Sequence, residues 1–148
     1  MTVVRLTVAH PQFAEAAELF DEYRQHYGAN PAPEAVEAWM RDQVRSERMR
    51  IFGAGRGDRL RAVCSVAVIP ASLTLRTVWL VRDLYVEPDS RRGGLARALL
   101  AHVADVARSE GAHRLSLQTE ADNTRALELY AKAGFEMVTD VALLNRLL

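Results

Sequence analysis

The sequence predicts a mixed α/β fold in which helices cover both faces of a β-sheet. Three observations support it. The segments Arg50–Ala54 and Arg59–Ala71 are rich in apolar and β-branched residues and are separated by glycines and an aspartate, as in a hairpin. A central run, Val78–Val86, ends in turn residues, and apolar residues at helical spacing follow from Leu95. A second strand and helix follow the same order after His113, which favours a layered sheet.

Three further elements precede the hairpin. Residues Val3–Val8 alternate as in a first strand, and Pro11 is suited to the first turn of a helix. The residues expected on the inner face of that helix are Phe13, Ala16, Ala17, Phe20 and Tyr27. A second helix begins near Pro33, and its inward residues are predicted to be Val36, Trp39, Met40 and Val44.

Composition and charge limit the functions that this protein can be expected to have. The 148 residues carry a formal net charge of zero, which gives no support for binding to nucleic acid or to an anionic membrane. The single cysteine, Cys64, lies in an apolar run and is expected to be a buried small residue, so neither a disulfide framework nor a metal cluster is predicted. We find no membrane-spanning run, signal peptide, linker or repeat, and therefore expect one cytoplasmic domain over residues 1–148.

The turn between the central strand and its helix carries the clearest chemical signal. The residues from Arg91 to Arg97 are Arg91, Arg92, Gly93, Gly94, Leu95, Ala96 and Arg97. Glycines let a ligand approach the backbone, and the first N–H groups of a helix have no partner within the helix. With several arginines beside them, the N–H groups of residues 92–97 are predicted to bind a polyanion such as a pyrophosphate. An ordinary glycine-containing corner is the alternative.

A second motif follows the next strand. In the stretch from Asn123 to Phe135, Asp122 or Asn123 can cap a helix and Gly134 can end it. The predicted buried stripe of this helix consists of Ala126, Leu127, Tyr130 and Ala133.

Together the two motifs resemble those of the GNAT family of N-acetyltransferases. Arg91, Gly94 and Ala96 fit the pattern Arg/Gln-x-x-Gly-x-Gly/Ala of its acetyl-CoA loop. Asn123 and Tyr130 belong to its second signature, and the resemblance extends over about Val78–Phe135. It implies a mixed, largely antiparallel sheet of six to seven strands flanked by about four helices. Acetyl-CoA would be the co-substrate and an amine the acceptor, without a metal.

The resemblance also assigns roles to residues. Backbone groups of Leu84, Tyr85 and Val86 would contact the pantetheine and the thioester, on a strand that is bulged and splayed from its neighbour. Asn123 would lie on the cofactor side. Tyr130 would protonate the leaving thiolate, or would only pack under the cofactor. The first two helices would border the acceptor site.

Acceptor and base residues are less well defined. On the first helix, Tyr23, His26 and Tyr27 are candidates to line the acceptor site, with core packing and a surface position as the alternatives. Glu87 and Glu120 lie near the ends of strands, where ligands bind in such sheets, and are candidate general bases. Asp83 is a third carboxylate there, expected on the same strand face as Tyr85. Each could instead be a surface or ion-paired group, and an amine of low pKa needs no base.

Two function classes follow from this reading. The first is an N-acetyltransferase that acts on a primary amine, either a small molecule or a peptide terminus, by direct attack in a ternary complex. The second is a non-catalytic module that binds acetyl-CoA as a sensor or scaffold; Tyr130 favours the enzyme. The sequence does not identify the acceptor. It also does not determine whether an acyl group larger than acetyl is transferred. A homodimer could form through a C-terminal strand over residues 141–147.

Overall fold

The computed structural model describes all 148 residues, which form two compact units, Met1–Gln118 and Thr119–Leu148. The elements of the first unit are β1 (Thr2–Leu6), α1 (Phe13–His26), α2 (Pro33–Arg45), β2 (Met49–Arg56), β3 (Arg59–Ala71), β4 (Arg76–Val86), the short 3₁₀ helix η1 (Pro88–Ser90), α3 (Leu95–Ser109) and β5 (Ala112–Leu117). The second unit contains α4 (Thr124–Lys132). The predicted hairpin, central strand and following helix are therefore confirmed.

The sheet has five strands in the order β1-β2-β3-β4-β5. Adjacent strands are antiparallel, except for β4 and β5, which are parallel. The predicted mixed and largely antiparallel sheet is therefore confirmed. The prediction of six to seven strands was wrong, and residues 141–147 form no strand. A strand exists only where a neighbour pairs its backbone groups, and the unit Thr119–Leu148 contains no other strand.

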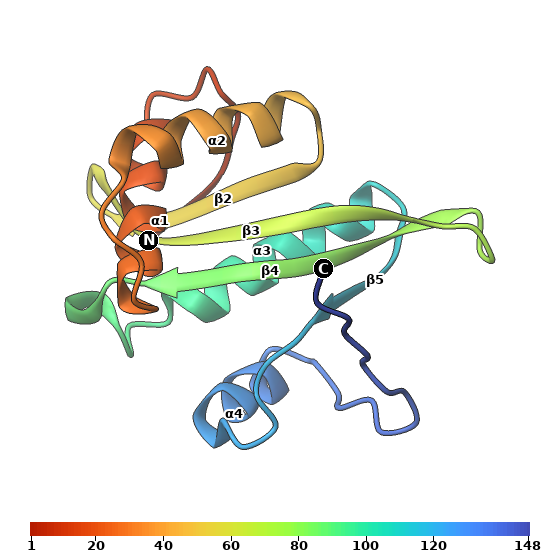
Figure 1. The fold of residues 1–148 in the computed structure, drawn as a ribbon. Helices are drawn as coiled ribbons and strands as arrows, with labels where there is room; N and C mark the ends of the chain where they lie inside the picture. The colour runs from red at the N-terminus through yellow and green to blue at the C-terminus, as the bar shows by residue number, and fades with distance from the viewer. The chain divides into compact units, whose positions relative to one another are not determined.

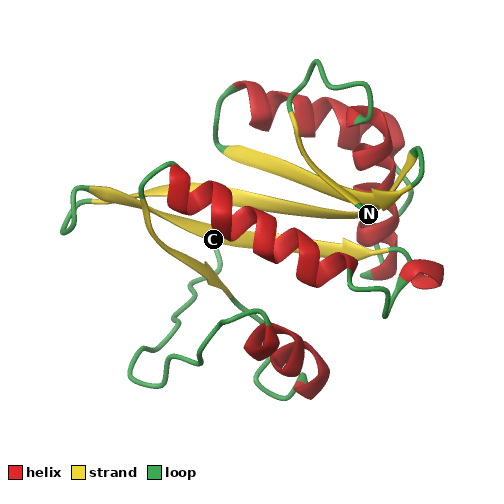
Figure 2. Cartoon of the chain, turned by 180° about the vertical axis from the view of Figure 1, so that it is seen from behind, coloured by secondary structure: helices red, strands yellow, loops and turns green.

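Helices cover both faces of the sheet in the first unit. Figures 1 and 2 show α1 and α2 on one face and α3 along the other. On the α1 side the core joins Phe13 and Met40 to Ile51 and Val63 of the sheet. On the α3 side Phe52 lies between Trp79 and His102, with ring centroids 6.5 and 5.8 Å away. This double coverage explains why most of β2 and β3 is buried on both faces.

Two aromatic residues predicted to face inward are instead exposed. Tyr27 follows the last residue of α1 and is 71% exposed, so the helical period no longer dictates its direction. Trp39 is 55% exposed because it lies at the edge of the α2 stripe, whereas Val36 and Met40 are buried. Phe13, Ala16, Ala17 and Phe20 are buried as predicted.

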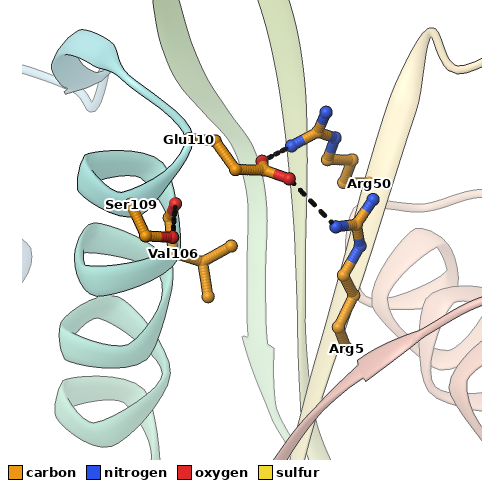
Figure 3. Close-up of polar contacts among 5 residues, drawn as sticks. All are labelled: Arg5, Arg50, Val106, Ser109 and Glu110. Atoms are coloured by element: carbon orange, nitrogen blue, oxygen red, sulfur yellow. Dashed lines mark hydrogen bonds and ion pairs between the residues drawn. The ribbon is translucent and has the colours of Figure 1, made fainter.

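An ion cluster ties β1 and β2 to the end of α3. Figure 3 shows the side chains of Arg5 and Arg50 converging on the Glu110 carboxylate. The Arg5 guanidinium lies 3.4 Å from Glu110 Oε1, and Arg50 pairs with the other oxygen while also stacking on Trp79 at 4.6 Å. Gly111, with φ +78°, follows the C-terminal end of this helix. The cluster therefore holds the C-terminal end of α3 on the two strands.

The unit Thr119–Leu148 is built around α4. The Asn123 side chain caps this helix by accepting the N–H of Ala126 at 3.2 Å, and Gly134 follows it with φ +93°, both as predicted. The predicted stripe of Ala126, Leu127, Tyr130 and Ala133 is only half-buried, and no residue of α4 is fully buried. A helix of nine residues in a unit of thirty has little apolar surface against which to bury a stripe.

Candidate active site

The end of β4 has one paired edge and one unpaired edge. Its parallel pairing with β5 stops at Val81, opposite Leu117, whereas its antiparallel pairing with β3 continues to Val86. A bulge at Arg82 shifts the register, because Ser65 pairs with Asp83 while Val66 pairs with Val81. Residues 83–86 therefore have no β5 partner. Leu84, Tyr85 and Val86 lie in this part of the strand, as expected of a splayed central strand.

The loop after β4 has an unusual backbone. Arg92 has φ +63° and Gly94, the residue before α3, has φ +81°, so two left-handed residues flank Gly93. The first hydrogen bond of α3 runs from the Ala98 N–H to the Gly94 carbonyl. The N–H groups of Leu95, Ala96 and Arg97 precede that bond and lie at the positive end of the helix dipole. They can act as donors to an anion.

Arg56 holds this loop from the β2–β3 hairpin. Its Nη2 donates to the Gly93 carbonyl oxygen at 2.7 Å. A Cβ atom at Gly93 would lie only 3.0 Å from the same nitrogen, so a glycine allows the guanidinium to approach this closely. A cavity of about 390 Å³ adjoins the contact, and its lining includes Arg56, Arg61 and Arg91. This position of Arg56 was not predicted, because the register of the β2–β3 hairpin brings the side chain to the loop.

Glu87, a predicted general base, is held by two donors. Arg61 Nη1 lies 2.6 Å from Glu87 Oε1, and the Ser90 hydroxyl donates to the same oxygen at 3.0 Å. The Glu87 side chain is only 14% exposed. Arg91, beside it, donates from Nε to the Val86 carbonyl oxygen at 3.0 Å. These contacts brace the turn, and they leave the Glu87 carboxylate paired with a cation.

A second cavity, of about 440 Å³, opens between α1, α2 and β4. Its lining is mainly apolar and comprises Phe20, Tyr23, Arg24, Ala32, Ala35, Val36, Trp39, Met40 and Asp83. The structure thus brings two of the predicted acceptor residues, Tyr23 and Asp83, to one pocket. His26 and Tyr27 do not line it, although Tyr27 packs edge-on against Tyr23 at 5.2 Å.

Asp83 and Tyr85 lie on the same face of β4, as predicted. The Asp83 carboxylate accepts the hydroxyl of Ser65, a fully buried residue on the neighbouring strand. The Tyr85 hydroxyl lies 3.5 Å from Glu22 of α1, and its ring lies 5.7 Å from that of Tyr23. Burial, and then the negative charge of Glu22, raise the pKa of Tyr85 above its usual value. Tyr85 is therefore a neutral donor at physiological pH.

Asp21 fixes the connection between the two helices beside this pocket. This carboxylate is buried, and it accepts the Ala32 N–H at 3.0 Å and the Gln25 amide at 3.3 Å. It also pairs with Arg24 at 3.4 Å. This role of Asp21 was not predicted, because its partner Ala32 lies beyond the helix and leaves no periodic signal in the sequence.

The remaining predicted residues, Glu120, Asn123 and Tyr130, belong to the unit Thr119–Leu148. Glu120 is exposed, and hydrogen bonds from its own backbone N–H and from Thr119 lower the pKa of its carboxyl, so it is ionised at neutral pH. The Tyr130 ring packs edge-on against Phe135, with centroids 6.1 Å apart. Asn123 is engaged as the cap of α4.

Neither a metal centre nor a membrane-spanning helix is found in the structure. Side chains of His, Cys, Asp and Glu nowhere gather in groups of three or more that could hold a metal ion. None of the helices is long and apolar enough to cross a membrane.

Comparison with known proteins agrees with this architecture. The acetyltransferase (GNAT) family matches residues 14–135. The uncharacterized N-acetyltransferase YhfO of Bacillus subtilis (strain 168) is 28% identical over 123 residues, which are 83% of each chain. The [ribosomal protein bS18]-alanine N-acetyltransferase of Escherichia coli (strain K12) is 29% identical over 84% of this chain and 79% of its own. A crystal structure described as a probable acetyltransferase superposes with a TM-score of 0.90, at 29% identity over 100% of this chain and 98% of the other.

The fold, the loop before α3 and these similarities define the class of the protein. The chain belongs to the GNAT family of acetyltransferases. It is an enzyme of the N-acetyltransferase class, as the resemblance of its two motifs implied.

Proposed function

We propose that this protein transfers the acetyl group of acetyl-CoA to a primary amine by direct attack in a ternary complex, with all 148 residues acting as one acetyltransferase domain. The observation that carries the proposal is the juxtaposition, within residues 1–118, of an arginine-bearing loop at the N-terminus of α3, a strand edge without a strand partner and an apolar pocket that contains a carboxylate. Acetyl-CoA supplies an activated thioester: the amine attacks its carbonyl carbon, the new C–N bond replaces the C–S bond, the CoA thiolate leaves and the amine loses a proton.

The loop residues fit the pyrophosphate of such a ligand. The N–H groups of Leu95, Ala96 and Arg97 donate at the helix N-terminus, and the side chains of Arg91 and Arg92 add positive charge beside them. The left-handed residue Gly94 turns the chain so that these groups follow directly on the loop. Charge-assisted hydrogen bonds of this kind are stronger than neutral ones.

The unpaired edge of β4 supports the reaction centre. A developing oxyanion is stabilised by donors that are fixed before the reaction begins. Backbone groups of residues 84–86 on the edge without a β5 partner are rigid because the other edge of the strand pairs with β3. We assign the thioester to this edge, next to the pocket that contains Asp83.

The candidates to accept the proton of the amine differ in whether they already have a charged partner. Glu87 already neutralises Arg61, so it is a weaker candidate base than the sequence suggested, and it stays a prediction together with Glu120. Asp83, with the neutral partner Ser65, can hold the amine and relay its proton to solvent. Tyr130 stays the predicted donor to the leaving thiolate, because a tyrosine hydroxyl can act as a general acid.

Cofactor binding is tested by Gly94→Glu. The substitution places bulk and negative charge at a left-handed position where the diphosphate is expected, so CoA binding should fall below detection by isothermal titration calorimetry. Ser109→Glu, an exposed substitution at the other end of α3, is the control for added charge and should bind as wild type. Unchanged CoA affinity in Gly94→Glu would refute the loop assignment.

The role of Tyr130 is tested by Tyr130→Phe, which keeps the ring that packs on Phe135 and removes only the hydroxyl. If the hydroxyl protonates the thiolate, turnover should fall by ~10²-fold while CoA affinity changes little. The alkaline limb of the pH–rate profile should also shift. A decrease of less than about threefold, with that limb intact, would make Tyr130 a packing residue.

A further inference from the structure

The pocket between α1, α2 and β4 is lined mainly by apolar side chains. Phe20, Val36 and Met40 are buried and form its inner surface, while Trp39 is exposed at 55% on its edge. Its volume of about 440 Å³ falls in the range of small-molecule sites. A site of this kind favours an apolar group, because polar side chains are a minority of its lining and compensate a buried hydroxyl or a second charge poorly.

Only one of the two charged residues in the lining lacks a charged partner. Arg24 is paired with Asp21 at 3.4 Å. Asp83 takes part in none of the ion pairs of the chain, and its neighbour is the uncharged Ser65 hydroxyl. Because Ser65 is fully buried, it fixes the carboxylate at the pocket without neutralising it. Glu22, 3.5 Å from the Tyr85 hydroxyl, does not line the pocket.

We infer that the acceptor is a primary amine attached to an apolar group of about the size of a phenyl or indole ring. The amine would lie at the Asp83 carboxylate, and the ring would pack against Phe20, Val36 and Met40. This inference rests on the proposed function and specifies its substrate class. It predicts poor use of polycationic and polyhydroxylated amines, since a single unpaired carboxylate in an apolar pocket compensates one charge.

The size of the effect follows from burial of the ring. Moving an aromatic side chain from water into an apolar site is favourable by an amount that corresponds to about 30- to 100-fold in an equilibrium constant. We therefore expect kcat/KM for 2-phenylethylamine to exceed that for ethylamine by about this factor. Ethylamine has the same amino group but leaves most of the cavity unfilled.

The experiment measures thiol release with acetyl-CoA and four acceptors, which are 2-phenylethylamine, ethylamine, spermidine and a tripeptide with N-terminal phenylalanine. The tripeptide distinguishes the source of the amine. A kcat/KM at or above that of 2-phenylethylamine would assign the acceptor to a polypeptide terminus, and a lower value would assign it to a small molecule. Either result supports the shared chemistry.

Two variants of α2 form a matched pair. Ala35 lines the pocket with an exposed methyl group, so Ala35→Leu should fill space without disturbing the core. It should lower kcat/KM for 2-phenylethylamine at least about tenfold and that for ethylamine less than about twofold. Ala38→Leu makes the same change at an exposed position outside the pocket and should leave both values unchanged.

Asp83→Asn keeps the shape of the side chain but removes its charge, and should lower kcat/KM for both amines about tenfold.

The outcomes separate this inference from the proposed function. Equal use of ethylamine and 2-phenylethylamine, or preference for spermidine, would overturn the inference, although acetylation itself would uphold the proposed function. Acetyl-CoA binding without acetylation of any of the four amines would also overturn it. Absence of acetyl-CoA binding in the wild-type protein would instead refute the proposed function. Equal effects of Ala35→Leu and Ala38→Leu would remove the pocket as the acceptor site.

Discussion

Replacing Arg56 by alanine should weaken binding of CoA about fivefold without unfolding the protein. The guanidinium donates to the Gly93 carbonyl oxygen at 2.7 Å, between two residues in the left-handed region, Arg92 and Gly94. Without this hydrogen bond the loop can relax toward conformations that present fewer N–H groups to the ligand. Arg56 would then be a positioning residue, which acts through the loop backbone.

The magnitude follows from two opposing quantities. A non-glycine residue in the left-handed region, such as Arg92, is unfavourable by roughly 1–2 kcal/mol. A hydrogen bond from a charged donor contributes about 1.5–3 kcal/mol when it is shielded from water. The Arg56–Gly93 hydrogen bond is exposed, so its contribution is at or below the lower end of that range. We therefore expect about 1 kcal/mol of loop organisation to be lost, which is about fivefold in Kd.

Isothermal titration calorimetry with CoA, at low and at high salt, measures this effect. Arg59→Ala is the matched control, since Arg59 pairs with Arg56 across the hairpin and carries the same charge, yet makes no hydrogen bond to the loop. Its effect should be less than about twofold and should vanish at high salt, because only screened electrostatics would be involved. Equal losses in both variants, or no loss in Arg56→Ala, would refute the reasoning.

Two further predictions concern stability. Glu110→Gln should lower the free energy of unfolding by about 0.5–1 kcal/mol in urea titrations, less so at high salt, because Glu110 pairs with both Arg5 and Arg50 at partly exposed positions. Asp105→Asn should change it by less than about 0.3 kcal/mol, since the Asp105–Arg108 pair is exposed on both sides, and a loss equal to that of Glu110→Gln would contradict this ranking. Burial raises the pKa of Cys64 from 9.0 to about 12, so the thiol ionises first in the unfolded chain and the free energy of unfolding should fall as the pH rises above 9. Cys64→Ala should remove this component of the pH dependence, and an identical alkaline slope in both proteins would show that the thiol is not its source.

Local signals explain why much of the fold was predictable. Residues near one another in the sequence determine the β2–β3 hairpin, the end of β4 at Val86 and the cap of α4 at Asn123. Turn residues, β-branched runs and capping side chains act within a few positions, so they are visible without a structure. The same holds for the loop before α3, where the glycines and arginines are contiguous.

Other features depend on which strands become neighbours. Arg56 reaches Gly93, and Ser65 reaches Asp83, through the register of β2, β3 and β4, and a bulge at Arg82 resets that register. No short-range pattern specifies such pairs. The predicted C-terminal strand failed for a related reason, since an alternating apolar sequence becomes a strand only beside a partner.

The different lengths of β4 and β5 explain why the candidate site lies where it does. Upstream of Arg82, β4 is paired on both edges and contributes Trp79 to the core. Downstream, the pairing with β5 has ended, so residues 83–86 keep the rigidity that β3 provides while the other edge of the strand has no strand partner. The bulge lies at this boundary, and the next residue, Asp83, faces the pocket beneath α1 and α2. A fixed backbone edge, a carboxylate and the N-terminal end of α3, whose first N–H groups precede the first helical hydrogen bond, thus follow one another within about fifteen residues, because a long antiparallel strand has a short parallel neighbour.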